Sequence, residues 1–470
     1  MLCVSLTPHD LPFAPARTDP ALAVEVRLDH FDQAVDAAGL RAATAGPLLA
    51  TFRSEHHLGR AAAADRDGSG WEQRLACLKA GFDWIDLELD ENDLDDKIAA
   101  VHAAGKKVVL SHHSLSVGVD LEPFLERALA TRADILKIIG TGGATADFAT
   151  QRRLYQRAGT RPLVHFFMGA DYYASRVLSL RYGAPFTFVA KSEAAAVAPG
   201  QVSISRMRDL FGDRGGPFEA FAVLGLPIAH SRSPGYHTPL LRSINQNALF
   251  VPLPGETDAD LALLLQTFPE LRGAAVTKPL KEAAARRADR FVHPEAADLG
   301  AVNTLLRDGS TWSAANTDYL AMETLLEDVV PAGRTVRVLG YGGLGKAVVA
   351  ACLKLGLPVE VTNRSAEKCR DLPAQARFLA WETRHEAGAY ALVQATSVGM
   401  APHDAMSPLE RVPEGVAVVM ETIYNPAVTQ LMKQAEAAGA RVLDGMLLFE
   451  KQAEIQNRLF RETLTADIGN

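Results

Sequence analysis

A single lysine interrupts an apolar, strand-like stretch of the chain, ADILKIIG (residues 133–140). Lysine is seldom fully buried, because apolar surroundings cannot replace the water that its ammonium group loses. One interpretation of Lys137 is an edge strand, or a side chain that extends to solvent. The other is an amine kept partly desolvated, which loses its proton more easily and attacks a carbonyl carbon.

A glycine-rich turn in the second half of the chain is the other feature with evident chemistry. Residues 335–356, TVRVLGYGGLGKAVVAACLKLG, have the pattern of a strand, a turn and a helix. The turn contains Gly340, Gly342 and Gly345 in the spacing G-x-G-x-x-G, which is typical of dinucleotide-binding sites when a strand and a helix flank it. We therefore predict a dinucleotide cofactor.

The residues after the next predicted strand indicate which dinucleotide binds. That strand, LPVEVTNRS, ends in Asn363 and Arg364 rather than in an acidic residue. An acidic side chain would bind a ribose 2′-hydroxyl, whereas a guanidinium suits a 2′-phosphate. Lys368 adds a second positive charge one helical turn later. We predict NADP rather than NAD, the alternative being that Arg364 only caps a solvated turn.

Eight short apolar or β-branched runs in the first half predict the strands that must position Lys137. Alanine-rich segments of helical character separate these runs. This arrangement is typical of a (β/α)8 barrel, and an open doubly wound sheet is the alternative. The runs are residues 2–7, 23–28, 48–53, 84–89, 107–113, 135–140, 162–169 and 185–190.

Polar residues gather at the carboxyl ends of these runs, where a barrel has its catalytic face. They are Arg27, Arg53, His112 and His113. Period-two alternation along the sixth run places Lys137 on the same inward face as Ile135 and Ile139. A barrel would therefore bury this lysine close to the catalytic face.

Length, charge and cysteine content exclude several classes of protein. The 470 residues are enough for two or three domains, and a net charge of −8 argues against a nucleic-acid or anionic-membrane partner. The four cysteines are scattered, so we expect neither a metal site nor a disulfide framework. No signal-like or membrane-length apolar segment is present. We expect a soluble, cytoplasmic protein, a monomer or homodimer, that binds small molecules.

The first half contains several short motifs in a fixed order. They are EVRLDHF (25–31), TFRS, IDLEL, SHHS, DILKI, SR (175–176) and APGQVS. In their order and spacing they resemble the motifs of the type I 3-dehydroquinate dehydratases. The resemblance covers residues 1–210 and implies a (β/α)8 barrel that dehydrates 3-dehydroquinate through a Schiff base.

The resemblance implies a role for each residue type. Lys137 would convert the substrate ketone to an iminium, which is an electron sink for the developing carbanion. His113, rather than His112, would take the proton and help water to leave. Asp86 would orient that imidazole. The expected substrate contacts are Glu25, Arg27, Arg53, Asp86, Met168, Arg176 and Gln201.

Two positions depart from the family pattern. Where members usually carry Glu, four residues after the strand arginine, this chain has His57, with Glu55 two residues earlier. Val197 replaces the serine of the usual loop sequence Ser-Ala-Pro-Gly-Gln. Both positions belong to substrate contact and loop closure, so they bear on turnover and affinity rather than on the type of reaction.

The second half has its own series of motifs. They are AVLGLPIAHSRSP (222–234), AAVTKPLKEAA (274–284), GAVNTL (300–305), NTDYL (316–320), ATSVGM (395–400) and DGMLLFEKQ. By these motifs residues 218–470 resemble the shikimate dehydrogenases, which implies reduction of 3-dehydroshikimate by NADPH. By this resemblance Lys281 would stabilise the negative oxygen and donate a proton, while Asp318 would hold the ammonium. Lys278 occupies a variable position, and Ala275 stands where many members have Asn.

The same resemblance implies the remaining contacts of this half. The expected substrate-binding residues are Ser231, Ser233, Thr277, Asn303, Tyr424 and Gln452. The expected cofactor-binding residues are Gly340, Gly342, Gly343, Gly345, Asn363, Arg364, Lys368, Thr396 and Gly445.

These resemblances predict an α/β chain of two enzymes. A (β/α)8 barrel would occupy residues 1–210, and the glycine-rich stretch 211–217 would be a linker. A two-lobed dehydrogenase would follow, with a substrate lobe (218–318 and 446–470) and a Rossmann NADP-binding lobe (319–445). The halves would catalyse consecutive steps of chorismate and aromatic amino-acid biosynthesis, the product of the first being the substrate of the second.

Two other hypotheses are compatible with the same folds. A metabolite sensor would keep both folds without catalysis. It would not need the four predicted catalytic residues, which are Lys137, His113, Lys281 and Asp318. A catabolic quinate dehydrogenase would use NAD, and the positive charges of Arg364 and Lys368 argue against it.

Overall fold

The computed structural model describes residues 1–10, 19–211, 217–229 and 231–466. The chain forms two compact units, residues 1–270 and 271–470, and each is described by itself. Most of the predicted linker lies outside the described residues, so the predicted domain limits stay predictions. No helix in the described part of the chain is long and apolar enough to cross a membrane.

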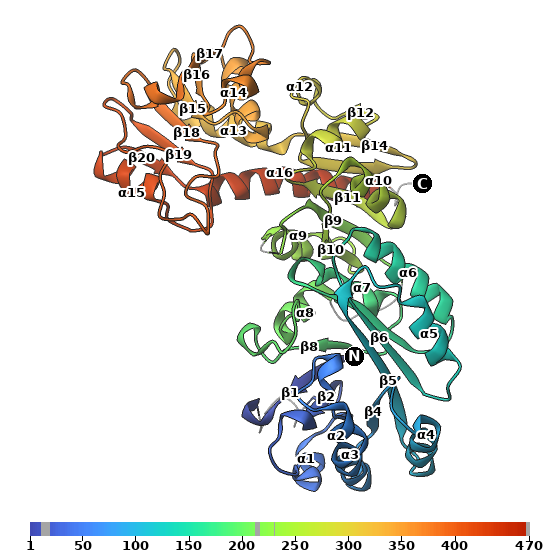
Figure 1. The fold of residues 1–470 in the computed structure, drawn as a ribbon. Coiled ribbons are helices and arrows are strands. Elements are labelled where there is room, and N and C mark those ends of the chain that lie inside the picture. Colours follow the sequence, from blue (N-terminus) through green and yellow to red (C-terminus); the bar gives the residue numbers. More distant parts are fainter. Residues whose placement is uncertain (11–18, 212–216, 230, 467–470) are drawn as a thin grey trace. The chain divides into compact units, whose positions relative to one another are not determined.

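Eight parallel strands in consecutive order form the barrel of the first unit (Figure 1). The last strand pairs with the first, Leu2 opposite Thr187, so the order returns to its start. Among the described strands, β7 and β8 stand at the two ends of this order and are not hydrogen-bonded to each other. The barrel is therefore nearly closed. The strands are β1 (Leu2–Leu6), β2 (Leu22–Arg27), β3 (Leu48–Thr51), β4 (Trp84–Glu88), β5 (Lys107–Val117), β6 (Ile135–Thr141), β7 (Leu163–Met168) and β8 (Thr187–Val189).

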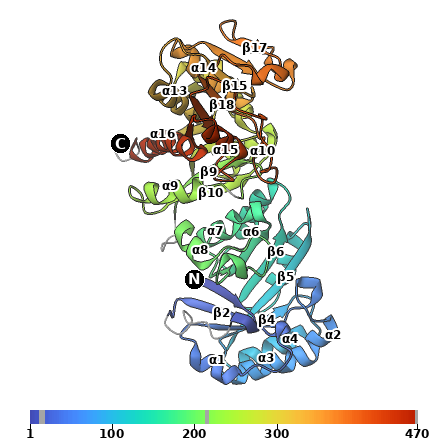
Figure 2. The same ribbon diagram turned by 90° about the vertical axis from the view of Figure 1, so that its left-hand side faces the viewer.

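All eight predicted strands are confirmed, and the open doubly wound alternative is wrong. A doubly wound sheet reverses its strand order at a switch point, whereas this order runs from one to eight without reversal. The helices lie on the outer side of the strands (Figures 1 and 2). They are α1 (Ala37–Ala43), α2 (Ala63–Asp67), α3 (Ser69–Lys79), α4 (Leu94–Ala103), α5 (Glu122–Leu129), α6 (Ala146–Ala158), α7 (Ala174–Arg181) and α8 (Ile204–Phe211).

Alternate residues of the strands fill the barrel interior, as a pleated strand requires. Ile135 and Ile139 of β6 belong to this core, and Lys137 lies between them on the same inward face. Each fully buried aliphatic or aromatic side chain stabilises the fold by about 1.5–3 kcal/mol. The other core members are Cys3, Ala23, Leu49, Val109, Val164, Phe166, Met168, Phe186 and Phe188.

The first unit continues past the barrel into a strand–helix repeat. Strands β9 (Glu219–Gly225) and β10 (Ala248–Pro254) pair in parallel. Helix α9 (Ser233–Arg242) connects them, and α10 (Asp258–Thr267) follows. Thr257 caps α10 by accepting a hydrogen bond from the Asp260 N–H at 3.1 Å, while the Asp260 carboxylate accepts one from the Thr257 N–H at 2.9 Å.

The second unit begins with a small antiparallel region. Strand β13 pairs with β11 and β14 in antiparallel fashion, and β12 pairs with β14 in parallel. The elements are β11 (Leu271–Val276), α11 (Lys281–Arg287), β12 (Arg290–Phe291), α12 (Pro294–Asp298), β13 (Thr304–Asp308), β14 (Thr311–Ala315) and α13 (Thr317–Val329).

A six-stranded parallel sheet completes the second unit, in the order β17-β16-β15-β18-β19-β20. This order is that of a dinucleotide-binding doubly wound fold, in which the first strand lies in the middle. The predicted Rossmann architecture is therefore confirmed. The elements are β15 (Val336–Leu339), α14 (Gly343–Lys354), β16 (Val359–Thr362), β17 (Arg377–Leu379), β18 (Ala391–Gln394), β19 (Val418–Glu421), α15 (Gln430–Ala437), β20 (Arg441–Leu443) and α16 (Gly445–Ala466).

The four cysteines of the chain are all described, and each is buried and free of disulfides. Cys3 and Cys77 lie in the first unit, Cys352 and Cys369 in the second.

Candidate active sites

Lys137, the third residue of β6, is buried inside the barrel, with 4% of its surface exposed. Its Nζ atom lies 3.5 Å from Asp86 Oδ2 and 3.8 Å from Glu25 Oε1. The same ammonium stands 4.1 Å from the ring centroid of Phe188. Of the two interpretations of this lysine, solvent exposure is therefore wrong, and the amine has a desolvated setting.

This setting favours the neutral amine. Burial lowers the pKa of Lys137, and the Arg53 guanidinium lowers it further. Asp86 and Glu25 oppose the shift, because their negative charges favour the ammonium. The net pKa is below the ordinary value of 10.5, so a larger fraction of this amine is nucleophilic at neutral pH.

Asp86 is bound by Arg53 and not by the predicted partner, His113. Its Oδ2 accepts a hydrogen bond from Arg53 Nη2 at 2.7 Å, and its Oδ1 accepts one from Ser111 Oγ at 2.7 Å. Burial alone would raise the pKa of Asp86, but Arg53 and Lys137 outweigh burial and lower it. An ionised Asp86 therefore balances the cations of this site, and the expectation that it orients the imidazole is corrected.

His113 lies on β5, opposite Ile139 of β6 in the register of the two strands. Its Nδ1 atom is buried and has no hydrogen-bond partner among the described residues. Burial, reinforced by Arg53 and Lys137, holds its pKa well below the ordinary value of 6.5. The imidazole is thus neutral at physiological pH, the form in which histidine accepts a proton.

Arg176 forms a buried cationic site beside the loop 197–201. Its Cζ atom lies 3.9 Å from the ring centroid of Phe166, and its Nη2 donates to Pro199 O at 3.4 Å. Burial lowers its pKa to about 9, and no carboxylate among the described residues pairs with it. A buried guanidinium without a counter-ion is suited to a substrate carboxylate.

The residues around Lys137 enclose one cavity at the carboxyl end of the strands. Glu25, which accepts from Ser5 Oγ at 2.6 Å and Thr51 Oγ1 at 3.0 Å, and Gln201, which accepts from the Val197 N–H at 2.8 Å, lie on its wall. The predicted residues that line it are Glu25, Arg27, Arg53, His113, Lys137, Met168, Arg176 and Gln201.

Several lining residues were not predicted. They are Ser5, His57, Leu58, Ile139, Phe166, Phe188, Val197 and Ala198. Phe188 could have been found from the period-two alternation of the predicted run 185–190, since Phe186, two residues earlier, belongs to the same core. His57 and Val197 were noted only as departures from a family pattern, and both contribute to the cavity wall.

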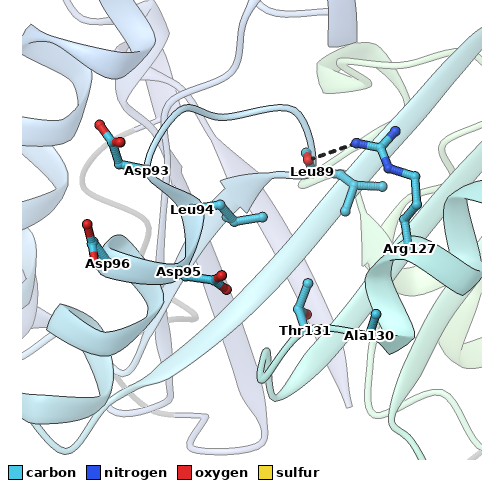
Figure 3. A pocket seen from close by; sticks show the side chains of 8 residues that line it. All are labelled: Leu89, Asp93, Leu94, Asp95, Asp96, Arg127, Ala130 and Thr131. Carbon is cyan, nitrogen blue, oxygen red and sulfur yellow. Dashed lines mark hydrogen bonds between the residues drawn. The ribbon is translucent and has the colours of Figure 1, made fainter.

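A second cavity of the first unit lies outside this set of residues (Figure 3). It is lined by the start of α4 and the end of α5, with Asp93, Asp95 and Asp96 among its residues. Arg127 donates from Nη2 to the Leu89 carbonyl at 3.4 Å along one wall. None of the predicted site residues lines this cavity.

His57, Glu88 and Asp90 place potential metal-ligand atoms within 4.8 Å of one another. Arg66 already donates from Nη1 to Glu88 Oε2 at 2.8 Å and to Asp90 Oδ1 at 2.9 Å. The guanidinium therefore takes the position that a metal cation would need, and this cluster is an ion-pair network rather than a metal site.

In the second unit Lys281 and Asp318 form the predicted ion pair. Lys281 Nζ donates to Asp318 Oδ2 at 2.6 Å, and both side chains are less than one-fifth exposed. Lys281 begins α11 and Asp318 lies in the first turn of α13. A half-buried ammonium held by a carboxylate can donate a proton to a carbonyl oxygen.

Asn303, Thr317 and Gln452 form a hydrogen-bonded cluster in the same unit. Asn303 Oδ1 accepts from the Thr317 N–H at 2.7 Å, and Thr317 Oγ1 donates to Gln452 Oε1 at 3.1 Å. Tyr424 is half-buried, with its ring centroid 5.5 Å from that of Phe449. Thr277 is half-buried after β11. Thr317 was not predicted, although it lies inside the motif NTDYL.

The two predicted serines belong to the first unit. Ser233 begins α9 and is 7% exposed. Ser231 is half-buried, and its Oγ accepts a hydrogen bond from the Ser233 N–H at 3.3 Å. A hydroxyl beside the N-terminus of α9 is suited to an anionic group.

The glycine turn after β15 fits a dinucleotide. Gly340 has φ = 100°, and a Cβ there would lie 2.7 Å from Thr396 Cγ2. A Cβ at Gly345 would lie 2.2 Å from Gly340 O, so a side chain at either position would fill the turn. A Cβ at Gly343 would lie 3.6 Å from Lys281 Cδ, which places the predicted catalytic lysine beside this turn.

The remaining predicted cofactor residues surround the same end of the sheet. Asn363 Oδ1 accepts from the Tyr341 N–H at 3.2 Å, and Arg364 and Lys368 are exposed after β16. Thr396 follows β18, and its Oγ1 donates to Gln394 Oε1 at 3.0 Å. Gly445 begins α16, where a Cβ would lie 2.3 Å from Ile423 O. These positions are those at which a doubly wound sheet binds its ligand.

Fold and site together define a lysine-dependent barrel enzyme joined to a dinucleotide-binding dehydrogenase. Residues 2–216 match the family model of type I 3-dehydroquinase. Residues 223–305 match that of the shikimate dehydrogenase substrate binding domain. The chain belongs to the family of bifunctional 3-dehydroquinate dehydratase/shikimate dehydrogenase proteins.

Similar proteins cover both halves. The chain is 30% identical over 472 residues to the chloroplastic bifunctional 3-dehydroquinate dehydratase/shikimate dehydrogenase of Arabidopsis thaliana, covering 93% of this chain and 77% of that protein. It is 35% identical over 256 residues to the shikimate dehydrogenase (NADP(+)) of Oleidesulfovibrio alaskensis, covering 52% and 90%. A shikimate 5-dehydrogenase structure from Thermus thermophilus is 31% identical, with a TM-score of 0.47, and covers 52% of this chain and 98% of that one.

Proposed function

We propose that Lys137 is the Schiff-base residue of the first of two consecutive reactions. The chain is a bifunctional enzyme of the shikimate pathway, a 3-dehydroquinate dehydratase and a shikimate dehydrogenase. The observation that carries the assignment is the buried Nζ of Lys137, whose pKa is lowered, in a cavity shared with His113. Addition of Nζ to the substrate ketone, with loss of its oxygen as water, gives the iminium.

The elimination needs one base that also acts as an acid. Neutral His113 takes a proton from the carbon next to the iminium carbon, and the electron pair moves into the iminium to form an enamine. The enamine expels the β-hydroxyl, which leaves as water with the proton from His113. Hydrolysis then releases 3-dehydroshikimate and returns the amine of Lys137. Arg176 binds the substrate carboxylate, and Asp86 keeps the positive charges of the cavity balanced.

Lys281 and Asp318 serve the second reaction. When bound, NADPH supplies the hydride that reduces the carbonyl carbon of 3-dehydroshikimate. Lys281 donates a proton to the carbonyl oxygen, and Asp318 orients the ammonium. Asn303 and Gln452, held by Thr317, and Tyr424, Thr277, Ser231 and Ser233 bind the substrate hydroxyls and carboxylate.

The cofactor is NADP(H), and the glycine turn with Thr396 and Gly445 holds its nicotinamide and pyrophosphate portions. Arg364 and Lys368 bind the 2′-phosphate, supported by the turn that Asn363 stabilises. Four free, buried thiols fit a reducing compartment such as the cytoplasm. We propose that the chain acts there as a monomer or homodimer.

The protein is expected to oxidise NADPH when 3-dehydroquinate is the only other substrate supplied. The first site must then produce 3-dehydroshikimate, which the second converts to shikimate. Loss of NADPH absorbance, with chromatographic identification of shikimate, measures both steps. Supplying 3-dehydroshikimate is the control for the second step, and absence of oxidation with either substrate would contradict the proposed reductase activity.

Replacing Arg364 by aspartate is expected to lower the preference for NADP over NAD by about 10- to 100-fold, because a hydrogen bond to a charged group contributes about 1.5–3 kcal/mol. The new carboxylate repels the 2′-phosphate and can accept from a 2′-hydroxyl. The ratio of kcat/KM values for NADPH and NADH measures the preference. Exposed Arg411 is the matched control, and Arg411→Asp should leave the ratio unchanged. An unchanged ratio in Arg364→Asp would defeat the assignment.

A further inference from the structure

His57 is a buried imidazole in the dehydratase cavity to which the reaction sequence gives no role. It ends the turn η4 (Glu55–His57), and its side chain is 6% exposed. It lines the cavity together with His113 and Lys137. Burying a polar ring costs free energy unless its nitrogen atoms find partners.

Both nitrogen atoms of His57 have partners, and these determine its tautomer. Nδ1 accepts a hydrogen bond from the backbone N–H of His113 at 3.1 Å, so this nitrogen carries no proton. The proton of the neutral ring is then on Nε2, which lies 3.5 Å from Asp90 Oδ1. The ring is therefore held between the main chain of the base and a carboxylate.

The carboxylate is itself fixed in place. Arg66 Nη1 donates to Asp90 Oδ1 at 2.9 Å and also to Glu88 Oε2 at 2.8 Å. On its other side the His57 ring packs edge-on against His113, with 5.8 Å between centroids and 66° between planes. A continuous series of contacts thus leads from Arg66 through Asp90 and His57 to the main chain of His113.

We propose that His57, oriented by Asp90, is a positioning residue for the dehydration: it fixes the backbone of His113 and so directs that imidazole to the substrate carbon beside the Schiff base. This inference rests on the proposed role of His113 as the base. The hydrogen bond is to the main chain of His113, and the edge-on packing of the two rings adds to it, so both contacts act on where the His113 ring lies. Proton transfer depends strongly on such placement.

The decisive comparison is between His57→Phe and His57→Gln. Phenylalanine keeps the ring volume but cannot accept the His113 N–H, whereas the glutamine side-chain oxygen can. We expect His57→Phe to lower the dehydratase kcat by about 10²-fold, the scale on which small misplacements of catalytic groups act, with KM changed by less than about threefold. His57→Gln should recover most of this loss. Asp90→Asn should give a smaller loss, because the neutral amide orients the ring less strongly.

Two further readouts separate positioning from structural damage. Borohydride should still trap the substrate on Lys137 in His57→Phe, because Schiff-base formation does not need the placement of His113. The kinetic isotope effect on kcat, with deuterium at the carbon that loses its proton, should rise as proton removal becomes slower. Shikimate dehydrogenase activity of the same chain reports that the rest of the protein is intact.

His56, exposed and on the same turn, is the matched control, and His56→Phe should keep the wild-type kcat. A dehydratase kcat for His57→Phe close to that of the wild type would overturn the inference. Loss of borohydride trapping together with kcat, or failure of His57→Gln to recover activity, would also overturn it. If His113→Gln retained turnover, the assignment of the base itself would fail, which is a separate result.

Discussion

Replacing Lys137 by methionine is expected to remove 3-dehydroquinate dehydration and to leave shikimate dehydrogenation unchanged. Methionine keeps the unbranched shape of the lysine stem, but it lacks the ammonium that lies over the Phe188 ring and cannot form an iminium. The loss of kcat should be about 10⁴-fold or more, the scale on which removal of a covalent nucleophile acts in other enzymes. Arg53 remains to balance Asp86, so the fold should tolerate the change.

The appearance of the conjugated ketone of 3-dehydroshikimate measures the first reaction, and NADPH consumption with added 3-dehydroshikimate measures the second. Mass spectrometry after borohydride treatment should show a substrate adduct on the wild-type chain and none on Lys137→Met. Exposed Lys107, at the start of β5, is the matched control, and Lys107→Met should retain both activities and the adduct. Substantial turnover by Lys137→Met would exclude the Schiff-base assignment.

Replacing Lys281 by methionine is expected to lower shikimate dehydrogenation and to leave 3-dehydroquinate dehydration unchanged. Loss of the ammonium leaves the developing negative oxygen without its proton donor, and loss of one such group costs about 10²- to 10³-fold in kcat. Asp318→Asn should cost less, because Lys281 keeps its charge and loses only the partner 2.6 Å away. KM for 3-dehydroshikimate should change little in either variant, because the proposed role is in the transition state.

Initial rates of NADPH oxidation with 3-dehydroshikimate measure this effect, and the dehydratase rate of the same preparation is the internal control. Lys278 is an exposed lysine three positions before Lys281, so Lys278→Met is the matched variant and should remain active. An equal loss in Lys278→Met and Lys281→Met would point to general electrostatic attraction of the substrate rather than to proton donation.

The arrangement of strands could be predicted from local patterns, because strand alternation and spacing are properties of neighbouring residues. Period-two alternation places Lys137 on the same face of its strand as Ile135 and Ile139. Because the interior of a barrel is the side that buries apolar residues, this face was predicted to point inward. The glycine turn after β15 could be predicted for the same reason, because the strand and the helix that flank it are adjacent to it in sequence. Strand ends and family motifs together predicted eight of the sixteen residues that line the dehydratase cavity.

The partners of individual side chains could not be predicted in the same way. Asp86 was expected to orient His113, but Arg53, which follows β3, and Ser111 of β5 bind its carboxylate instead. Strand alternation predicts on which face of the strand a side chain lies, but it does not predict which neighbouring side chain it contacts. His57 was noted as a departure from a motif, and its contacts with His113 and Asp90 depend on segments far apart in the chain.

Burial of the four cysteines makes the native thiols poor nucleophiles toward alkylating reagents. Burial raises the pKa of Cys77 and of Cys352 to about 12, and it raises that of Cys3 and of Cys369 as well. Thiolate, the reactive form, is therefore scarce at neutral pH. A cysteine introduced at the exposed Val197, in the loop that ends at Gln201, would then be the preferred site for a maleimide dye on the wild-type background. Fluorescence from that position would follow the loop over the dehydratase cavity during turnover, with no need to remove any native cysteine.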